Sequence, residues 1–479
     1  MNAKRILIIG STILAIVIIC CIASCKKDVY IYSESPNIED STNCPPNKEV
    51  QKAKLKFYLE CSASMNGYMD HSGKFKDAIN ECLSMLNASG NFDTIQLNYI
   101  GKNVHLFNPN FTLNQTESLL NQFLNPSYYE YNKANILHLK DSKNKNSGIT
   151  YQDRNYSKLS EILDTVIGRT KEDVSVLVSD CILDPYDGQP ENYLSLCKTD
   201  IYNLFQNVLK KYPNLAVQII QLNSKFVGSY YYKVSNPDLE NTGKKSITES
   251  IPLNGEVRPY YIWIIANRNS ISKFNDKLNR LAEHNENQEL IHSVIFAPKN
   301  DINIEINTNN PNGKLSEKDG IADFKIVADM GDLLIDDISW ITNKDNYILE
   351  SRKARKDEIT IYGDIEYDSL TKKITLPIKL TKVKPDIETT IKLKSKKGEM
   401  LQWVNDVNGI NAKNDAKNRK TTGIKSIIEG VANAYSDFNG DYMTEFKICT
   451  TTDKSDVKKT STHPKDKKKQ KQTKQSKEK

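Results

Sequence analysis

The chain has 479 residues, which is enough for two or three domains. Its formal net charge of +6 originates at one end, because residues 452–479 hold eleven Lys against four acidic residues. The nine Cys include no Cys-x-x-Cys pair, and the chain contains neither G-x-x-x-x-G-K-[ST] nor G-x-G-x-x-G. The sequence therefore gives no motif for a zinc ribbon, a redox dithiol, a P-loop or a dinucleotide site.

Residues 1–24 have the pattern of a secretory signal peptide, with a basic start and an apolar run over residues 6–22. The Ile-Ala-Ser-Cys run that ends at Cys25 resembles the lipobox of bacterial lipoproteins, in which the Cys is acylated and becomes the new N-terminus. The resemblance implies a lipid anchor at Cys25; an uncleaved N-terminal membrane anchor is the alternative. Both place the protein at the cell membrane or the outer membrane, facing away from the cytoplasm.

Two compositionally biased segments flank the predicted folded part. Residues 25–52 are polar and lack apolar periodicity, which predicts a flexible tether. Residues 451–479 predict a disordered, solvated basic tail, with electrostatic contact to anionic lipid, polysaccharide or nucleic acid as the alternative. The tail has no aromatic residue for base stacking, so we expect no nucleic-acid partner.

Residues 55–60 form a short apolar run of strand-forming residues, which predicts a buried strand. The run ends in Glu60, and Ser62 and Ser64 follow at alternate positions before an Asn-Gly turn. Apolar residues at helical spacing predict an amphipathic helix over residues 74–86. Glu60, Ser62 and Ser64 are therefore expected where a parallel strand gives way to a helix, the edge at which open α/β sheets bind ligands.

The alternation of strands and helices continues to about residue 298. Strands are predicted at residues 94–100, 104–107, 173–179, 215–222, 258–266 and 290–297, and helices at residues 155–168, 193–212 and 271–282. This order predicts a doubly wound, mostly parallel α/β sheet over residues 53–298.

From residue 301 the pattern changes to short segments that alternate polar and apolar residues. They lie at residues 302–306, 322–328, 358–367, 373–380 and 387–393. Short strands separated by polar turns predict a β-rich, sandwich-like domain over residues 299–450. A late helix at residues 423–435 and a strand at residues 441–449 are expected to close this domain, with Trp340 and Trp403 in its core.

The carboxylate-x-Ser-x-Ser run resembles the Asp-x-Ser-x-Ser signature of von Willebrand factor A domains, which is one part of their metal-ion-dependent adhesion site. Glu60, Ser62 and Ser64 match the signature by position, with Glu60 in place of the family's Asp. The added methylene of Glu60 either moves the metal outward or prevents it from binding.

The resemblance also implies ligands from two further loops. Asp180, which follows the strand at residues 173–179, matches the third-loop Asp. Ser157 matches the second-loop hydroxyl, with Thr150 as the alternative. The resemblance implies a Mg²⁺ or Mn²⁺ site with one position open to an acidic side chain of an unidentified protein partner, because hard cations take oxygen ligands.

The combined interpretation is a lipid-anchored binding, adhesion or scaffolding protein rather than an enzyme. A hydrolase that uses Ser62 or a metal-bound water near Asp180 is the first alternative. A structural module with a degenerate site is the second, because the hydroxyls of Ser62, Ser64 and Ser157 are also typical of helix N-caps. In that case nearby backbone N–H groups satisfy Asp180.

Overall fold

The computed structural model describes most of the chain between residues 28 and 453. The described ranges are 28–34, 54–69, 73–90, 92, 94–112, 117–125, 149, 153, 158–170, 173–183, 190–235, 246–275, 278–286, 292–299, 302–308, 310, 313–316, 320–330, 338–355, 357–395 and 402–453. Cys25, Thr150 and Ser157 lie outside them. Among the described helices, none has the length and apolar character needed to cross a membrane.

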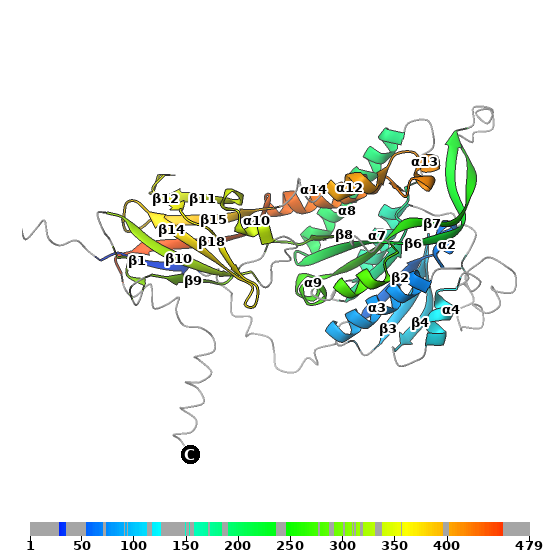
Figure 1. Ribbon diagram of the computed structural model, residues 1–479, viewed down its shortest axis with the longest axis horizontal. Helices are drawn as coiled ribbons and strands as arrows, with labels where there is room; N and C mark the ends of the chain where they lie inside the picture. The colour runs from blue at the N-terminus through cyan, green and yellow to red at the C-terminus, as the bar shows by residue number, and fades with distance from the viewer. Residues whose placement is uncertain are drawn as a thin grey trace, which may run out of the picture.

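Two bodies lie end to end along the long axis of the molecule (Figure 1). The first, which we call the α/β body, is built on a seven-stranded sheet with the order β4-β3-β2-β5-β7-β6-β8. Its strands are β2 (Leu55–Glu60), β3 (Ile95–Ile100), β4 (Val104–Phe111), β5 (Val174–Ser179), β6 (Leu215–Ser235), β7 (Ser246–Asn267) and β8 (His292–Phe296).

The prediction of a doubly wound, mostly parallel sheet is wrong. Only the pairs β2–β3 and β2–β5 are parallel, and the other four pairs are antiparallel. The predicted strands at residues 215–222 and 258–266 are the bases of one long hairpin, β6–β7, paired from Leu215↔Asn267 to Ser235↔Ser246. A parallel pair needs a crossover connection, usually a helix, whereas a hairpin makes its two strands antiparallel.

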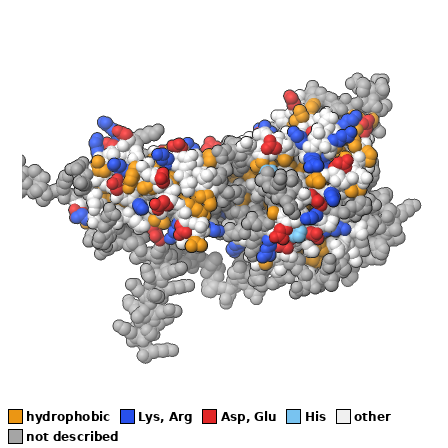
Figure 2. Space-filling model, viewed as in Figure 1, with side chains coloured by type: hydrophobic (Ala, Val, Ile, Leu, Met, Phe, Trp, Pro, Cys, Tyr) orange, Lys and Arg blue, Asp and Glu red, His pale blue; other side chains and the backbone are white. Residues whose placement is uncertain are grey.

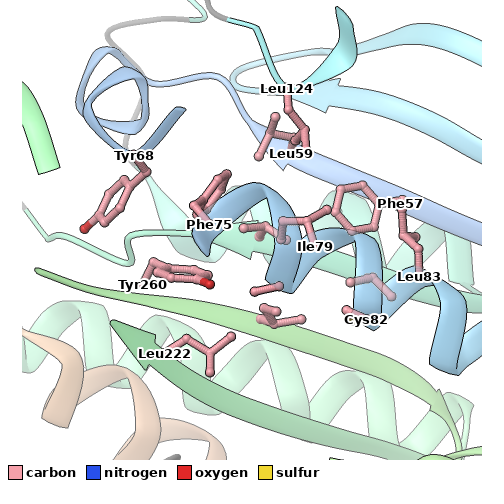
Figure 3. Packing of buried hydrophobic residues seen from close by; sticks show 14 of the residues in the cluster. Phe57, Leu59, Tyr68, Phe75, Ile79, Cys82, Leu83, Leu124, Leu222 and Tyr260 are labelled. Atoms are coloured by element: carbon pink, nitrogen blue, oxygen red, sulfur yellow. The ribbon is translucent and has the colours of Figure 1, made fainter. Parts of the chain in front are cut away.

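Helices cover both faces of this sheet. One face carries α3 (Gly73–Gly90), α4 (Glu117–Phe123), α9 (Arg268–Asn275) and η5 (Leu278–His284); the other carries α7 (Leu159–Thr170), α8 (Pro190–Lys211) and α14 (Ile424–Asn439). Figure 3 shows how Phe57 of β2 packs near Ile79 and Leu83 of α3. Tyr58 points to the opposite face, as the two-residue period of a strand requires.

The second body, which we call the β body, consists of two antiparallel sheets over a shared apolar core. One sheet has β1 (Tyr30–Glu34), β18 (Tyr442–Thr451), β15 (Glu388–Lys394) and β11 (Tyr347–Arg352); the other has β12 (Ile359–Ile361), β14 (Lys373–Leu380), β10 (Ala322–Asp329), β9 (Ile304–Asn307) and β13 (Glu366–Asp368). Two short elements, α10 (Ile338–Thr342) and η7 (Lys344–Asn346), precede β11. Phe324, Ile326 and Ala328 of β10 alternate inward, which fits a strand with one buried face.

Some segments belong to a different body from the one that the predicted domain boundaries imply. Residues 30–34, expected in a flexible tether, form β1, and Ile31 is buried in the core of the β body. The late helix α14, expected in the β-rich domain, instead buries Ile427 and Val431 in the core that it shares with α8. Trp403 also belongs to the α/β body, where its ring stacks on His292 at 4.8 Å.

Short elements follow β2 and precede α14. They are η2 (Ala63–Met65) and α2 (Asn66–Met69) after β2, and α12 (Gln402–Val407), β16 (Asn408–Gly409), α13 (Ala412–Lys417) and β17 (Thr421–Thr422) before α14. We call residues 408–423 the α13 segment. It packs on the β6–β7 hairpin, because Ala412 and Ala416 are buried in the same core as Phe226 and Tyr230.

Candidate functional site

Two of the predicted site residues end neighbouring parallel strands. Strands β2 and β5 pair with Leu59 opposite Val178, so Glu60 and Asp180 follow at the same edge of the sheet. Adjacent strands lie about 4.7–4.9 Å apart, which brings the two carboxyl groups close together. Glu60 is 3% exposed and Asp180 is 2% exposed. The sheet therefore buries a pair of acids at its carboxyl edge.

The two predicted hydroxyl ligands lie on the loop after β2. Ser62 precedes η2 in an extended conformation and makes no side-chain capping hydrogen bond. Its Oγ lies 3.1 Å from the Oγ of Ser64. Ser62 is buried and Ser64 is half-buried, so the loop opens toward solvent at Ser64. N-capping, the alternative role for these hydroxyls, is not the role that Ser62 plays.

The loop after β5 holds Asp180 by backbone contacts. Cys181 has φ +53, a left-handed conformation that is uncommon for a side chain with Cβ and that turns the chain back on itself. The Cys181 N–H donates to Ser179 Oγ at 2.8 Å, and the Ile182 N–H donates to Asp180 Oδ1 at 3.2 Å. Asp180 Oδ2 is buried and has no hydrogen-bond partner among the described residues. This oxygen is the candidate atom for a ligand, and the Ser64 hydroxyl is near enough to the same carboxyl group to lower its pKa.

We call Glu60, Ser62, Ser64 and Asp180 the edge cluster. Burial, and then repulsion by the Asp180 carboxylate, raises the pKa of Glu60, while the hydroxyls of Ser179 and Ser62 lower it. Burial also raises the pKa of Asp180, against the opposing effects of the Ser64 hydroxyl, the Ile182 N–H and the Arg258 charge. Two carboxylates that share one buried site are not readily ionised at the same time, because their charges repel each other. Without a bound cation, the pair therefore tends to retain a proton.

Sequence reasoning missed Ser179 and Arg258. Ser179 was read only as the end of a strand, although a hydroxyl next to the site acid was a usable signal. Arg258 was read as part of a core strand, and it is fully buried in β7. An Arg at the start of the apolar run over residues 258–266 was the available signal, because a buried charge needs compensation.

Arg258 binds the α13 segment to the sheet. Its guanidinium donates to the carbonyl oxygens of Asp415 at 3.0 Å, Ala416 at 2.7 Å and Lys420 at 2.9 Å. The Leu183 N–H, from the loop that carries Asp180, donates to the Thr422 carbonyl at 3.0 Å. The α13 segment therefore lies beside the Asp180 loop.

The remaining predicted ligand, Ser157, and its alternative Thr150 lie outside the described residues. In the described part of the chain, no group of three or more His, Cys, Asp or Glu side chains is arranged to hold a metal ion. A cation at the edge cluster would therefore depend on two carboxylates supplemented by hydroxyl oxygens. Mg²⁺ accepts this donor set, because it is held by one or two carboxylates and keeps several waters. The buried Oδ2 of Asp180 fits such an ion.

Comparison with protein-family models, curated proteins and solved structures finds no match to this chain.

Proposed function

We propose that the chain is a lipid-anchored, extracytoplasmic binding protein whose edge cluster holds Mg²⁺ or Mn²⁺. Through that cation it would bind an acidic side chain of a protein partner. The observation that carries the proposal is the buried Oδ2 of Asp180, which has no hydrogen-bond partner among the described residues and lies beside a second buried carboxyl group.

The charge balance at the edge cluster supports a cation. With both acids ionised the pair has a charge of −2, and burial makes that charge costly unless it is compensated. A divalent ion would neutralise both carboxylates and would use the hydroxyl oxygens of Ser62 and Ser64 as neutral ligands. When bound, it would supply a positive centre that attracts a carboxylate from solvent.

The resemblance to the adhesion site of von Willebrand factor A domains supports the same use of the cluster. The resemblance lies in the strand-end residues, and the sheet around them is mixed rather than mostly parallel. The anchor is supported by the sequence alone, because the apolar run at residues 6–22 and Cys25 lie outside the described residues.

Two other functions are distinguished by the same reagents. A hydrolase would show turnover that Ser62→Ala abolishes. A structural module would use the Glu60–Asp180 pair as a protonated contact and would bind its partner without a metal.

Isothermal titration of the full chain with MgCl₂ and MnCl₂ tests the metal directly. We expect saturable heat for the wild type, none for Asp180→Asn, weaker binding for Ser62→Ala, and retained binding for Glu60→Asp, which restores the family ligand. Asp173→Asn is the matched control, because Asp173 precedes the same strand at its opposite end and should leave binding unchanged.

The partner is tested by capture from membranes with and without chelator. Capture that depends on the metal and is lost in Asp180→Asn supports the proposal. Absence of both heat and a melting shift at millimolar Mg²⁺ and Mn²⁺ would contradict it and leave the metal-free module.

A further inference from the structure

The pairing of β1 with β18 brings two distant parts of the chain together. The strands are antiparallel, and Tyr30, the first residue of β1, lies opposite Thr451, the last residue of β18. Opposed residues in such a pair have Cα atoms about 4.5–5.5 Å apart. The basic segment at residues 452–479 therefore leaves the β body beside the point where the N-terminal segment enters it.

The N-terminal segment is held from its first described residue. Asp28 pairs with Lys314 at 2.8 Å, and the Leu315 N–H donates to the Val29 carbonyl at 3.0 Å. Two residues lie between Cys25 and Asp28, so the three steps of chain span at most about 11 Å even when fully extended. With the anchor at or just before Cys25, this end of the β body lies at the membrane surface.

The edge cluster lies at the opposite end of the molecule. Figure 1 shows β1 at the outer end of the β body, whereas α2, which follows the Ser62–Ser64 loop, lies at the far end of the α/β body. Strand β18 runs from Tyr442, just after α14, to Thr451. Its 10 residues separate the α/β body from the anchored end by about 30 Å.

The charge of residues 452–479 suits this location. Eleven Lys against four acidic residues give a net charge of +7, with no aromatic residue. Basic residues are attracted to anionic lipid only within about one Debye length of the surface, roughly 8–10 Å at physiological salt. The β1–β18 pairing places the start of the segment where this attraction acts.

Three acids of the folded surface at this end are paired with lysines, which reduces their attraction for the basic segment. Asp28 pairs with Lys314 at 2.8 Å, Glu358 with Lys382 at 3.1 Å and Lys384 at 3.0 Å, and Asp386 with Lys353 at 3.5 Å. The Thr450 hydroxyl donates to the Lys384 carbonyl, which places this lysine pair at the same end. Figure 2 shows basic and acidic side chains interspersed over the β body.

We propose that residues 452–479 form a second, electrostatic membrane contact that takes anionic phospholipid headgroups beside the N-terminal anchor. The β body then stands on the membrane, and the edge cluster faces away from it. The proposal rests on the proposed anchor, and the experiment separates the two.

The test uses the full chain, purified from membranes in detergent and reconstituted into vesicles of phosphatidylcholine alone or with 30% phosphatidylglycerol. An environment-sensitive dye on Ser476→Cys, with Cys44 and Cys197 changed to Ser, reports quenching by headgroup spin-labelled lipid. We expect at least threefold stronger quenching on the anionic vesicles, lost in 0.5 M NaCl. Changing the eleven lysines to Gln should abolish the difference, and changing them to Arg, the matched control, should keep it.

Equal quenching on both vesicles, or an unchanged signal in the Gln variant, would overturn the contact. A salt-sensitive dye shift without vesicles would also overturn it, by showing that the segment binds the folded body. Flotation with neutral vesicles tests separately whether the N-terminal lipid anchor binds the membrane. A chain that fails to float there refutes the anchor, while quenching on anionic vesicles still decides the contact.

Discussion

The guanidinium of Arg258 lies 2.7 Å from the carbonyl oxygen of Ala416, which joins the centre of β7 to the end of α13. Two more carbonyls accept hydrogen bonds from the same group, and the ring of Tyr230 lies 4.4 Å from its central carbon. These contacts compensate a buried cation and position a segment from late in the chain beside the Asp180 loop. The shape of the site therefore depends on a residue outside the proposed ligands.

Replacing Arg258 tests this link. Arg258→Gln should lower the free energy of unfolding by about 3 kcal/mol or more, because it leaves several buried carbonyls without donors. Arg258→Lys should lower it less, since the charge remains but the forked donor geometry is lost. Urea unfolding measures both. Arg352→Gln, at a side chain 82% exposed, is the control and should change stability by less than about 0.5 kcal/mol. Equal effects at the two sites would contradict the role of Arg258.

Gly67 lets the loop after β2 pack against the β6–β7 hairpin. A Cβ placed on Gly67 would lie 2.3 Å from the ring of Phe226, which is fully buried. Gly67→Ala should therefore destabilise the protein by about 1–3 kcal/mol through overpacking. Gly168→Ala in α7 is the matched control, because its Cβ meets nothing within 4 Å and alanine favours the helix by about 1 kcal/mol. Thermal melting of both variants should show opposite shifts; a shift of the same sign would refute the steric argument.

The sequence predicted those parts of the site that depend on local pattern. The strands that carry Glu60 and Asp180 are short and apolar, and they pair in parallel with their ends at one edge, as the pattern indicated. The α13 segment beside them had no such signal. Its contact with the site depends on Arg258, whose partners lie more than 150 residues away in the sequence.

The misjudged fold has a similar origin. The hairpin arm alternates buried residues, such as Phe226, Tyr230 and Tyr232, with more exposed ones. Nothing in that local alternation shows which strand is the partner, so the two bases of the hairpin were predicted as separate parallel strands. The five residues of β1 are too few to show a period, so their place in the β body was also missed.

Ile31 tests whether β1 is structural. It is 3% exposed in the core of the β body, so Ile31→Ala should cost about 2–4 kcal/mol of stability. Ser33→Ala, in the same strand and only half-buried, is the control and should have little effect. Denaturant titration of the β-body transition gives the values. If Ile31→Ala behaves like the control, residues 30–34 act as a tether.

The anchor is tested at Cys25. Cys25→Ala removes the thiol that acylation requires, so we expect loss of lipid labelling and release or misprocessing of the protein. Fractionation and metabolic labelling with a fatty acid measure this, with Cys44→Ser as the control thiol. Unchanged labelling and membrane fractionation in Cys25→Ala would refute lipidation at this position.

The last prediction concerns the dependence of stability on pH. Burial and the Asp180 charge raise the pKa of Glu60 from 4.5 to about 8 in the folded protein. The unfolded chain releases this proton near pH 4.5, so the folded state alone retains it at higher pH. The resulting stability is fully present below pH 4.5 and is lost as pH rises toward about 8.

Glu60→Gln removes that titration. In chelator, the wild type should lose stability relative to Glu60→Gln as pH rises from 4.5 to 8, by a few kcal/mol at about 1.4 kcal/mol per pKa unit. Titration of the groups that both proteins share cancels when the free energies of unfolding of the two proteins are subtracted. Mg²⁺ or Mn²⁺ should restore wild-type stability more at pH 8 than at pH 5, because the cation binds the ionised pair. Scanning calorimetry at several pH values gives both curves. Parallel curves in chelator would show that Glu60 ionises normally, and the compensation argument for a cation would then lose its basis.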